Sequence, residues 1–385
     1  MLVSYSLTER QVMLKDLCRE IAETKIKPLS AALDEKEEFP YEIIKVLAQS
    51  DLLGIGIPEK YEGIGGGVVE LCIATEELSR IDAGVATSYA ANFLAAFPII
   101  LFGREKQKEK YLPDLARGKK LAAFALTEPD AGSDVTNLKT IAKKEGDFYV
   151  LNGTKHFITN GGEAEIYVVI ATVDPKKGSR GQTAFIVEKG MEGFSFGKKE
   201  SKLGVRSSAT RELVFSDCKV PKENVLGREG MGFIIAVKTF DHSRPGVAAQ
   251  SVGIAQGALE LAVSYAHQRV QFGQKITSFQ GIQWMLAMMA TKIEAARGLV
   301  YNVANMIDKG EKNVGAASAM AKLFASEVAM EVTTDAVQIF GGYGYMKDYP
   351  VEKFMRDAKV TQIYEGTSEI QKSIIAANLI KKYGK

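Results

Sequence analysis

Residues 148–172 read FYVLNGTKHFITNGGEAEIYVVIAT, and this stretch decides the fold class. It holds two runs of β-branched and aromatic residues, with the turn-forming pairs Asn152-Gly153 and Asn160-Gly161 between them. Runs of the same kind follow further along the chain, and the complete set is 148–151, 166–172, 183–187 and 212–215. No segment with helical spacing separates them. Strands that follow strands predict a small antiparallel β domain rather than a doubly wound parallel sheet.

Apolar residues return to helical spacing on both sides of this region. Near the start, Thr8 and Gln11 form a capping-box pattern, which predicts that a helix begins there. Towards the end, apolar residues step by three or four positions over 282–307 and 320–339, which is typical of long helices in a bundle. The sequence therefore predicts an α+β chain with an N-terminal α-helical domain, a central antiparallel β domain and a C-terminal helical bundle. The expected domains are residues 1–119, 120–232 and 233–385.

The composition is that of an ordinary globular protein without a strong charge. Lys plus Arg number 49 and Asp plus Glu 47 in 385 residues, a formal net charge of +2, and no long run carries one sign. Nucleic acid and anionic membrane surfaces are therefore not expected partners. The cysteines Cys18, Cys72 and Cys218 form no CxxC pair, so neither a disulfide framework nor a zinc site is expected.

Two segments bear on where the protein resides. The first ten residues lack a basic start followed by an apolar run, so no export signal is predicted and a cytoplasmic location of bacterial type is expected. Residues 83–103 carry no charge and are long enough to cross a bilayer. Because Thr87, Asn92 and Pro98 interrupt this segment, a buried helix that lines a pocket is favoured over a membrane span.

Several common catalytic motifs are absent from the sequence. It contains no GxGxxG between a strand and a helix, no Walker loop and no GxSxG. His156, His242 and His267 share no metal-ligand spacing, so no metal site is predicted. Composition and periodicity alone predict only a globular α+β protein in three parts.

Three short segments are more specific. Residues 126–134, LTEPDAGSD, resemble the first signature of the flavin-dependent acyl-CoA dehydrogenases, and residues 338–357 resemble the second. Residues 364–368, YEGTS, are similar to the catalytic segment of the short- and medium-chain members. The resemblance covers essentially the whole chain and implies a helical domain, a β domain and a C-terminal four-helix domain, assembled as a homotetramer. It also implies FAD bound between the β domain and the bundle, partly covered by the adjoining subunit.

By this resemblance, the reaction is the α,β-dehydrogenation of an acyl-CoA thioester to the 2-enoyl-CoA. Glu365 is the expected base, and hydride passes to flavin N5. The thioester oxygen is expected to accept from the backbone N–H of Glu365 and from a ribityl hydroxyl of FAD. The apolar neighbours Ile363 and Tyr364 suggest partial desolvation, which raises a carboxyl pKa. Relatives that carry the base on an upstream helix have it at the position matched by Ser243, and serine cannot act as that base.

The resemblance also assigns residues to the cofactor and the substrate. FAD contacts are expected from Leu126, Thr127, Ser133, Phe157, Thr159, Arg269, Phe272, Gln338, Gly342 and Thr367. Four of these are expected to reach the FAD of a neighbouring subunit: Arg269, Phe272, Gln338 and Gly342. Substrate contacts are expected from Ser133, Asp241, Arg244, Tyr364 and Gly366. Ordinary alternatives exist, because threonine and phenylalanine are common in strands and Ser133 and Thr367 suit helix caps.

The resemblance narrows the acyl group to a monocarboxylic one. The acyl pocket is expected around Tyr89–Leu94 together with Tyr364. Ala86 stands where glutaryl-CoA dehydrogenases carry an arginine, so a dicarboxylyl substrate is disfavoured. The small side chains of Ala90 and Ala91 leave room for a linear, branched or alicyclic group. Electron-transferring flavoprotein is the expected electron acceptor, and an acyl-CoA oxidase that uses oxygen and a non-catalytic CoA-binding scaffold are the alternatives.

Overall fold

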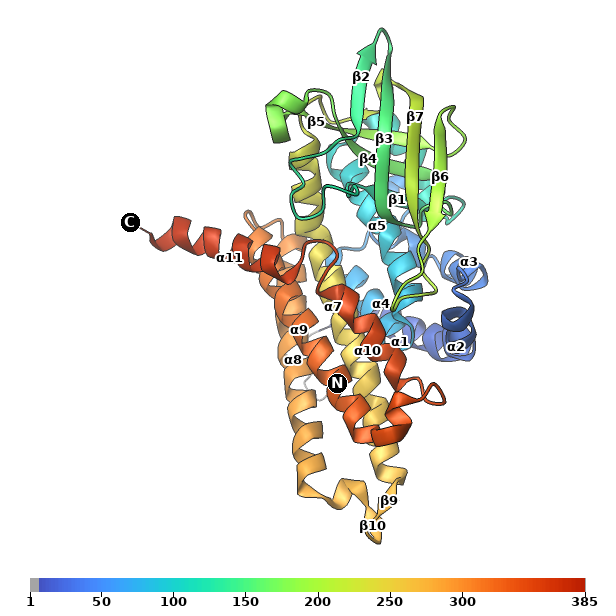
Figure 1. Cartoon of the computed structure of the whole chain (residues 1–385), viewed down its shortest axis with the longest axis vertical. Helices are drawn as coiled ribbons and strands as arrows, with labels where there is room; N and C mark the ends of the chain where they lie inside the picture. Colours follow the sequence, from blue (N-terminus) through green and yellow to red (C-terminus); the bar gives the residue numbers. More distant parts are fainter. Residues whose placement is uncertain (1–6, 385) are drawn as a thin grey trace.

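A computed structural model gives the structure of the chain and describes residues 7–384. Figure 1 shows the β domain at one end of the molecule and the long C-terminal helices extending to the other. The N-terminal helices are α1 (Glu9–Ile21), α2 (Lys27–Lys36), α3 (Tyr41–Gln49), α4 (Val68–Ser79), α5 (Ala83–Phe102) and α6 (Glu105–Ala116). A π-helical turn, Ala22–Ile26, joins α1 to α2.

Two of these helices confirm predictions from the sequence. At the start of α1, the Gln11 N–H donates to Thr8 Oγ1 at 3.3 Å and the Thr8 N–H donates to Gln11 Oε1 at 3.0 Å, which is the predicted capping box. Helix α5 coincides with the uncharged segment and is long and apolar enough to cross a membrane. However, 72% of its most apolar window is buried inside the protein, and part of the helix lines a cavity. This outcome agrees with a core helix that lines a pocket.

The β domain is a single sheet of mixed direction. Its strands are β1 (Ala122–Ala125), β2 (Ile141–Glu145), β3 (Phe148–Thr159), β4 (Ile166–Thr172), β5 (Gln182–Glu188), β6 (Phe194–Lys199), β7 (Thr210–Pro221) and β8 (Val225–Leu226). They lie in the order β6-β7-β3-β2-β4-β5-β8, with β1 beside β4. Most pairs are antiparallel as predicted, but β1 and β2 both run parallel to β4. Parallel neighbours arise here because the chain crosses over through β2 and β3 before it returns beside β1.

The predicted turn at Asn152-Gly153 is wrong. Strand β3 continues through both residues, and its register against β7 shifts at this point. The Asn152 side chain is bonded across the pair to Asp217, both to its backbone N–H and to its carboxylate. A Cβ on Gly153 would lie 2.7 Å from Thr140. The glycine therefore marks a β-bulge where another segment approaches closely, rather than a hairpin.

The C-terminal helices form the predicted bundle. They are α7 (Gly232–Gln268), α8 (Gln280–Asp308), α9 (Gly315–Phe340), α10 (Val351–Thr361) and α11 (Ser368–Tyr383). Helices α7 and α9 pack against each other, and both contact α8 and α10. Their apolar faces meet in the core, where Val252 of α7 and Val332 of α9 are at most 1% exposed. Helix α11 extends away from the bundle, as Figure 1 shows.

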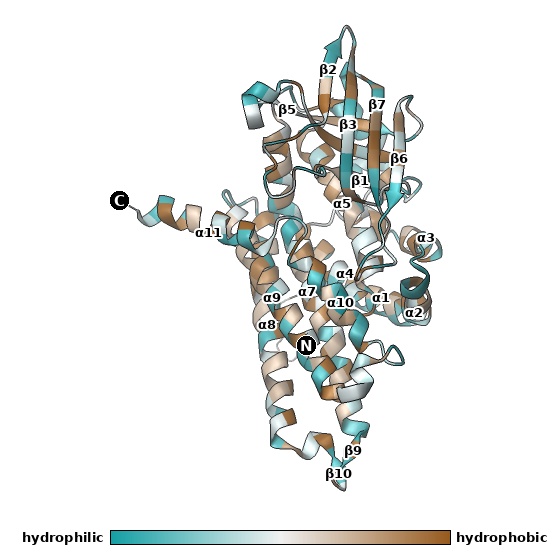
Figure 2. Cartoon of the chain, in the orientation of Figure 1, coloured by the Kyte–Doolittle hydropathy of each residue, from teal (hydrophilic) through white to brown (hydrophobic). Residues whose placement is uncertain are grey.

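A short hairpin ends the bundle on the side away from the β domain. It consists of β9 (Val270–Gln271) and β10 (Gln274–Lys275). Figure 2 shows that hydrophilic residues gather in this hairpin and at the tip of β2, at the two ends of the molecule. The apolar residues are left to the interior between these ends, where the sheet and the helices meet.

Candidate active site

Two cavities meet at Glu365, where the β domain and the bundle come together. The first has a volume of about 150 Å³ and the second about 600 Å³. Leu126, Thr127, Phe240 and Glu365 line both of them. A carboxylate therefore stands at the junction between a small apolar space and a larger channel.

The chain turns sharply where it places this carboxylate. Glu365 follows the end of α10 and has a φ of +52°, which is uncommon for a residue with a side chain. The next residue, Gly366, has a φ of +97°, and a Cβ there would lie 2.7 Å from Gln371 Nε2. Glycine is required at 366 for both reasons. Strained backbone of this kind is found where a function demands a particular direction for a side chain.

The polar surroundings of Glu365 act on both its side chain and its backbone. The Ser243 hydroxyl of α7 donates to Glu365 Oε2 at 2.5 Å. The Gln371 amide of α11 donates to the Glu365 carbonyl at 3.2 Å, and the Arg244 guanidinium donates to it at 3.4 Å. No carbonyl or side chain of residues 7–384 accepts a hydrogen bond from the Glu365 N–H. Within residues 7–384, the Glu365 N–H is thus available to a ligand, as are the neighbouring N–H groups of Gly366 and Thr367.

Burial raises the pKa of Glu365 above its ordinary value. The hydrogen bond from Ser243 and the positive charges of Arg244 and Lys322 oppose part of this rise. A carboxyl group with a raised pKa is a better proton acceptor than an exposed one, once it is ionised. The direction agrees with the expected desolvation, but Ile363 is 52% exposed, and of the two apolar neighbours only Tyr364 lines the cavity.

The first cavity has apolar walls and a polar end. Ala90, Ala91 and Leu94 of α5 line it, whereas Tyr89 is fully buried and is not part of the lining. At the polar end, the Tyr364 hydroxyl donates to Gln250 Oε1. The Gln250 amide in turn donates to Thr87 Oγ1 at 2.8 Å and to the Ala83 carbonyl at 3.0 Å. This chain of hydrogen bonds fixes the side chains that close the cavity.

The wall of the first cavity on the β-domain side fits a flat aromatic group with polar edges. Phe157 lies at a second bulge in β3 with a φ of +58°, and its ring is 59% exposed. The hydroxyl-bearing residues Thr127 and Thr159 line the same cavity. An exposed ring and two hydroxyl groups, in the cavity that Glu365 also lines, offer stacking and hydrogen bonding to an isoalloxazine. The residues present therefore fit FAD.

The second cavity gathers most of the predicted substrate contacts. Ser133, Asp241, Arg244 and Gly366 line it. Asp241 and Arg244 are each 5% exposed, and Arg244 Nη1 lies 3.7 Å from Asp241 Oδ1. Thr367 lines neither cavity, because its hydroxyl accepts from the Ile370 N–H and caps α11.

Four predicted FAD residues lie elsewhere, near the far end of the bundle. Arg269 and Gly342 line a third cavity of about 570 Å³. Phe272 is 94% exposed in the turn between β9 and β10, and Gln338 is exposed on α9. Twenty-five residues of α7 separate Arg244 from Arg269, which at 1.5 Å per residue is roughly 37 Å. Within one chain, these residues are not brought to the Glu365 site.

Three residues at the site have no local signal in the sequence. Gln250, Lys322 and Gln371 reach it from α7, α9 and α11, through the hydrogen bonds given above and a bond from Lys322 Nζ to the Gly366 carbonyl. Ser243 is different, because the family resemblance singles out its position as the place of the base in some relatives. The sequence excludes serine as a base but does not show that its hydroxyl bonds to Glu365.

Glu365, Phe157, Thr127 and Thr159 thus line one small cavity. This arrangement fits the class that the comparisons show, a flavin-dependent oxidoreductase acting on CH–CH bonds. Family models described as the N-terminal, middle and C-terminal domains of acyl-CoA dehydrogenase match residues 8–119, 123–218 and 230–380. The chain belongs to the acyl-CoA dehydrogenase family, and FAD is its cofactor.

Individual relatives support the same assignment over the full length. The "Acyl-CoA dehydrogenase, short-chain specific" of Clostridium acetobutylicum is 50% identical over 98% of this chain and 100% of its own. The solved butyryl-CoA dehydrogenase of Megasphaera elsdenii is 50% identical with a TM-score of 0.96, covering 98% of this chain and 100% of that one. A chain in a structure described as "Electron transferring flavoprotein of Acidaminococcus fermentans: Towards a mechanism of flavin-based electron bifurcation" is 51% identical, again with a TM-score of 0.96 and coverage of 98% and 100%.

Proposed function

We propose that Glu365 is the base in the α,β-dehydrogenation of a short-chain, monocarboxylic acyl-CoA to the 2-enoyl-CoA. The observation that carries this proposal is the position of Glu365, at the junction of the small apolar cavity and the larger channel. The acyl chain occupies the first cavity, and the pantetheine arm of CoA extends through the second, along Ser133, Asp241 and Arg244. The thioester then lies beside Glu365.

The residues of this chain perform the proton chemistry. Glu365 removes the proton from the carbon next to the thioester carbonyl, and its raised pKa makes the carboxylate a stronger base than usual. The unbonded N–H of Glu365 donates to the thioester oxygen and stabilises the negative charge that develops there. When bound, FAD supplies the hydride acceptor. Phe157, Thr127 and Thr159 hold it against the first cavity.

The size and lining of the first cavity support a short, uncharged acyl chain. Its volume of about 150 Å³ leaves little space beyond the polar end at Gln250 and Tyr364. No lysine or arginine lines it, so a distal carboxylate would have no cation to pair with. Two relatives whose names specify short-chain or butyryl substrates agree with this choice.

The electron acceptor and the assembly are two further parts of this proposal. Electron-transferring flavoprotein is the proposed acceptor, because a chain similar to this one is part of a structure described by that name. A homotetramer is the proposed assembly. Four residues predicted to contact FAD lie far from Glu365 in their own chain: Arg269, Phe272, Gln338 and Gly342. Their contact with FAD therefore requires a second copy of the chain. The guanidinium of Arg269 would suit a pyrophosphate there.

Glu365→Gln tests the central assignment. The variant keeps the size of the side chain but cannot accept the proton, so kcat/KM for butyryl-CoA is expected to fall by about 10²–10⁴-fold. The flavin absorbance and butyryl-CoA binding are expected to persist, because the cavities are unchanged. Glu20→Gln, an exposed change on α1, is the control and is expected to be fully active. Near-normal turnover of Glu365→Gln would remove Glu365 from this role.

A further inference from the structure

Lys322 of α9 is an unusual neighbour of the Glu365 turn. Its side chain is 0% exposed, and its Nζ donates to the Gly366 carbonyl at 2.7 Å. Within residues 7–384, Lys322 forms no ion pair. Burial of an ammonium group against a neutral carbonyl is costly, because neither the lost hydration nor the charge is fully compensated. The position of this charge therefore calls for a role.

The hydrogen bond from Lys322 is part of a set that fixes two consecutive carbonyls. Gln371 Nε2 donates to the Gly366 carbonyl at 2.9 Å and to the Glu365 carbonyl at 3.2 Å, and Arg244 Nε donates to the latter at 3.4 Å. Three side chains from three helices thus hold both carbonyls of a turn in which φ is positive twice. The Glu365 N–H, in contrast, has no acceptor among residues 7–384.

We propose that Lys322 is a positioning residue for Glu365: it holds the turn through the Gly366 carbonyl, and its positive charge keeps the Glu365 carboxylate ionised and ready to accept a proton. The proposal rests on Glu365 acting as the base. It assigns to the buried charge a purpose that a neutral hydrogen-bond donor could not serve. The nearest source of positive charge on α7, Arg244, is itself neutralised in part by Asp241 at 3.7 Å.

Several elements contribute charged or titratable side chains around Glu365. The charged and titratable side chains that line the two cavities with it are Lys238, Asp241, His242, Arg244, Tyr364 and Lys381. Behind the turn lies Lys322 of α9, and Glu369 of α11 acts on this lysine from outside. Of all these groups, only Arg244 and Lys322 lower the pKa of Glu365 through their charge.

Lys322 carries its positive charge at neutral and acid pH. Burial lowers its pKa to about 8, and the negative charge of Glu365 opposes part of this decrease. Below about pH 8 the lysine is therefore protonated and favours the ionised form of the carboxyl group. Removal of this charge raises the pKa of Glu365. At a given acid pH, a larger fraction of the enzyme then carries Glu365 in its protonated form, which cannot act as a base. The acid limb of the pH profile must then move to higher pH.

The test measures kcat/KM for butyryl-CoA against pH in the FAD-loaded enzyme, since this parameter reports ionisations of the free enzyme. Lys322→Gln keeps a hydrogen-bond donor without the charge, and Lys322→Met removes both. In each, the acid limb is expected to move up by about 0.5 to 1 pH unit. Lys322→Arg keeps a cation and is expected to restore the limb. Lys202→Met is the matched control, because Lys202 also donates to a neutral carbonyl, that of Ser208, and burial also lowers its pKa to about 8.

A second readout does not depend on turnover. Binding of a non-reactive S-butyl-CoA thioether, followed by the change in flavin absorbance, is measured over the same pH range in the same variants. Its pH dependence is expected to vanish in Glu365→Gln and to move upward in Lys322→Gln and Lys322→Met by the amount seen in the kinetic limb.

The outcomes separate this inference from the proposed function. An unchanged acid limb in both Lys322→Gln and Lys322→Met would overturn the role of Lys322 while Glu365→Gln stays inactive. The role of the charge would also be overturned if the acid limb moved in Lys322→Met but not in Lys322→Gln, because the hydrogen bond would then suffice. Full activity of Glu365→Gln would instead defeat the assignment of the base.

Discussion

Gln250 helps to close the polar end of the first cavity, which we propose holds the acyl chain. It is 2% exposed, it lines the cavity, and it accepts the Tyr364 hydroxyl while donating to Thr87 and Ala83. Gln250→Ala removes both the volume of the amide and the acceptor that holds Tyr364. We expect kcat/KM for octanoyl-CoA to rise relative to butyryl-CoA by about 10-fold, since a methylene or two of extra space is worth that order.

The measurement is the ratio of kcat/KM for the two thioesters in each enzyme. The free energy of unfolding should also fall by about 1–3 kcal/mol, because the buried hydroxyl of Tyr364 loses its acceptor. Gln268→Ala, at the exposed end of the same helix, is the control and should leave the ratio unchanged. A ratio that stays constant in Gln250→Ala would show that other residues set the chain length.

Single residues at the site differ in how far the sequence could predict them. Thr127, Phe157 and Glu365 lie in short conspicuous runs, and the structure brings them to one cavity, although their roles stay predictions. Lys322 reaches the Glu365 turn from α9, 44 positions before Gly366, whereas Gln371 folds back onto it from the first turns of α11. On a helix, a lysine or glutamine is usually solvated, so only the tertiary contact reveals these two.

At the scale of elements, the sequence predicts the long helices with strong apolar periodicity well, but it does not predict the short or irregular strands. The spacing over 282–307 and 320–339 predicted α8 and α9, because long amphipathic helices carry their own pattern. Strand β1 was missed, since Ala122–Ala125 is mostly alanine and its place is set by pairing with β4. Its parallel direction depends on the path of the chain through space, which no local pattern encodes.

Lys155 of strand β3 forms a buried ion pair close in the chain to Phe157, which lines the first cavity. The Lys155 ammonium, 0% exposed, donates to Glu128 Oε1 at 2.7 Å and to the Leu126 carbonyl at 2.8 Å, two residues before the bulge at Phe157. Glu128 also accepts from the Thr140 N–H at 3.0 Å. Lys155→Met leaves a buried carboxylate unpaired, so stability should fall by about 3–5 kcal/mol and FAD should dissociate more readily.

Denaturant unfolding and the fraction of FAD retained after gel filtration check this prediction. The double variant Lys155→Met/Glu128→Gln removes the unpaired charge and should recover part of the lost stability. Its FAD retention should stay low, because the Leu126 carbonyl still lacks its donor. A double variant that is no more stable than the single one would contradict the unpaired-charge explanation.

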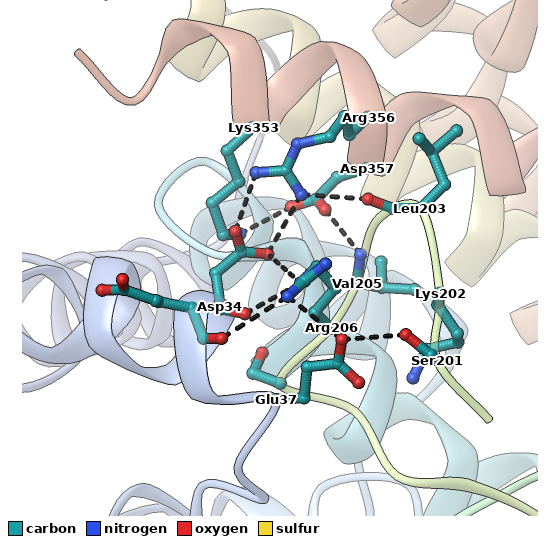
Figure 3. A network of polar contacts seen from close by, with 12 residues as sticks. Asp34, Glu37, Ser201, Lys202, Leu203, Val205, Arg206, Lys353, Arg356 and Asp357 are labelled. Atoms are coloured by element: carbon teal, nitrogen blue, oxygen red, sulfur yellow. Dashed lines mark hydrogen bonds and ion pairs between the residues drawn. The ribbon is translucent and has the colours of Figure 1, made fainter. Parts of the chain in front are cut away.

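At the scale of the whole molecule, a polar network joins three segments that are far apart in the sequence. Figure 3 shows Arg356 of α10 extending to Asp34 of α2 and to the Leu203 carbonyl, beside Asp357, which accepts from the Val205 N–H. The bonds from Arg356 measure 2.7 Å to Asp34 Oδ2 and 3.0 Å to Leu203. They tie the N-terminal helices and the segment after β6 to α10.

We expect this network to affect activity, because α10 leads directly into the turn that carries Glu365. Arg356→Met removes the cation and leaves the Asp34 carboxylate, 7% exposed, with only Arg206 at 3.8 Å. The free energy of unfolding should fall by about 3 kcal/mol, somewhat less than for a fully buried pair because Arg356 is partly exposed. The kcat should fall as well, because α10 no longer fixes the turn, whereas the pH dependence set by Lys322 should not move. Lys222→Met, which breaks the exposed pair with Asp147, is the control and should change neither quantity. If Arg356→Met loses stability but keeps full kcat, the network holds the three parts together without positioning Glu365.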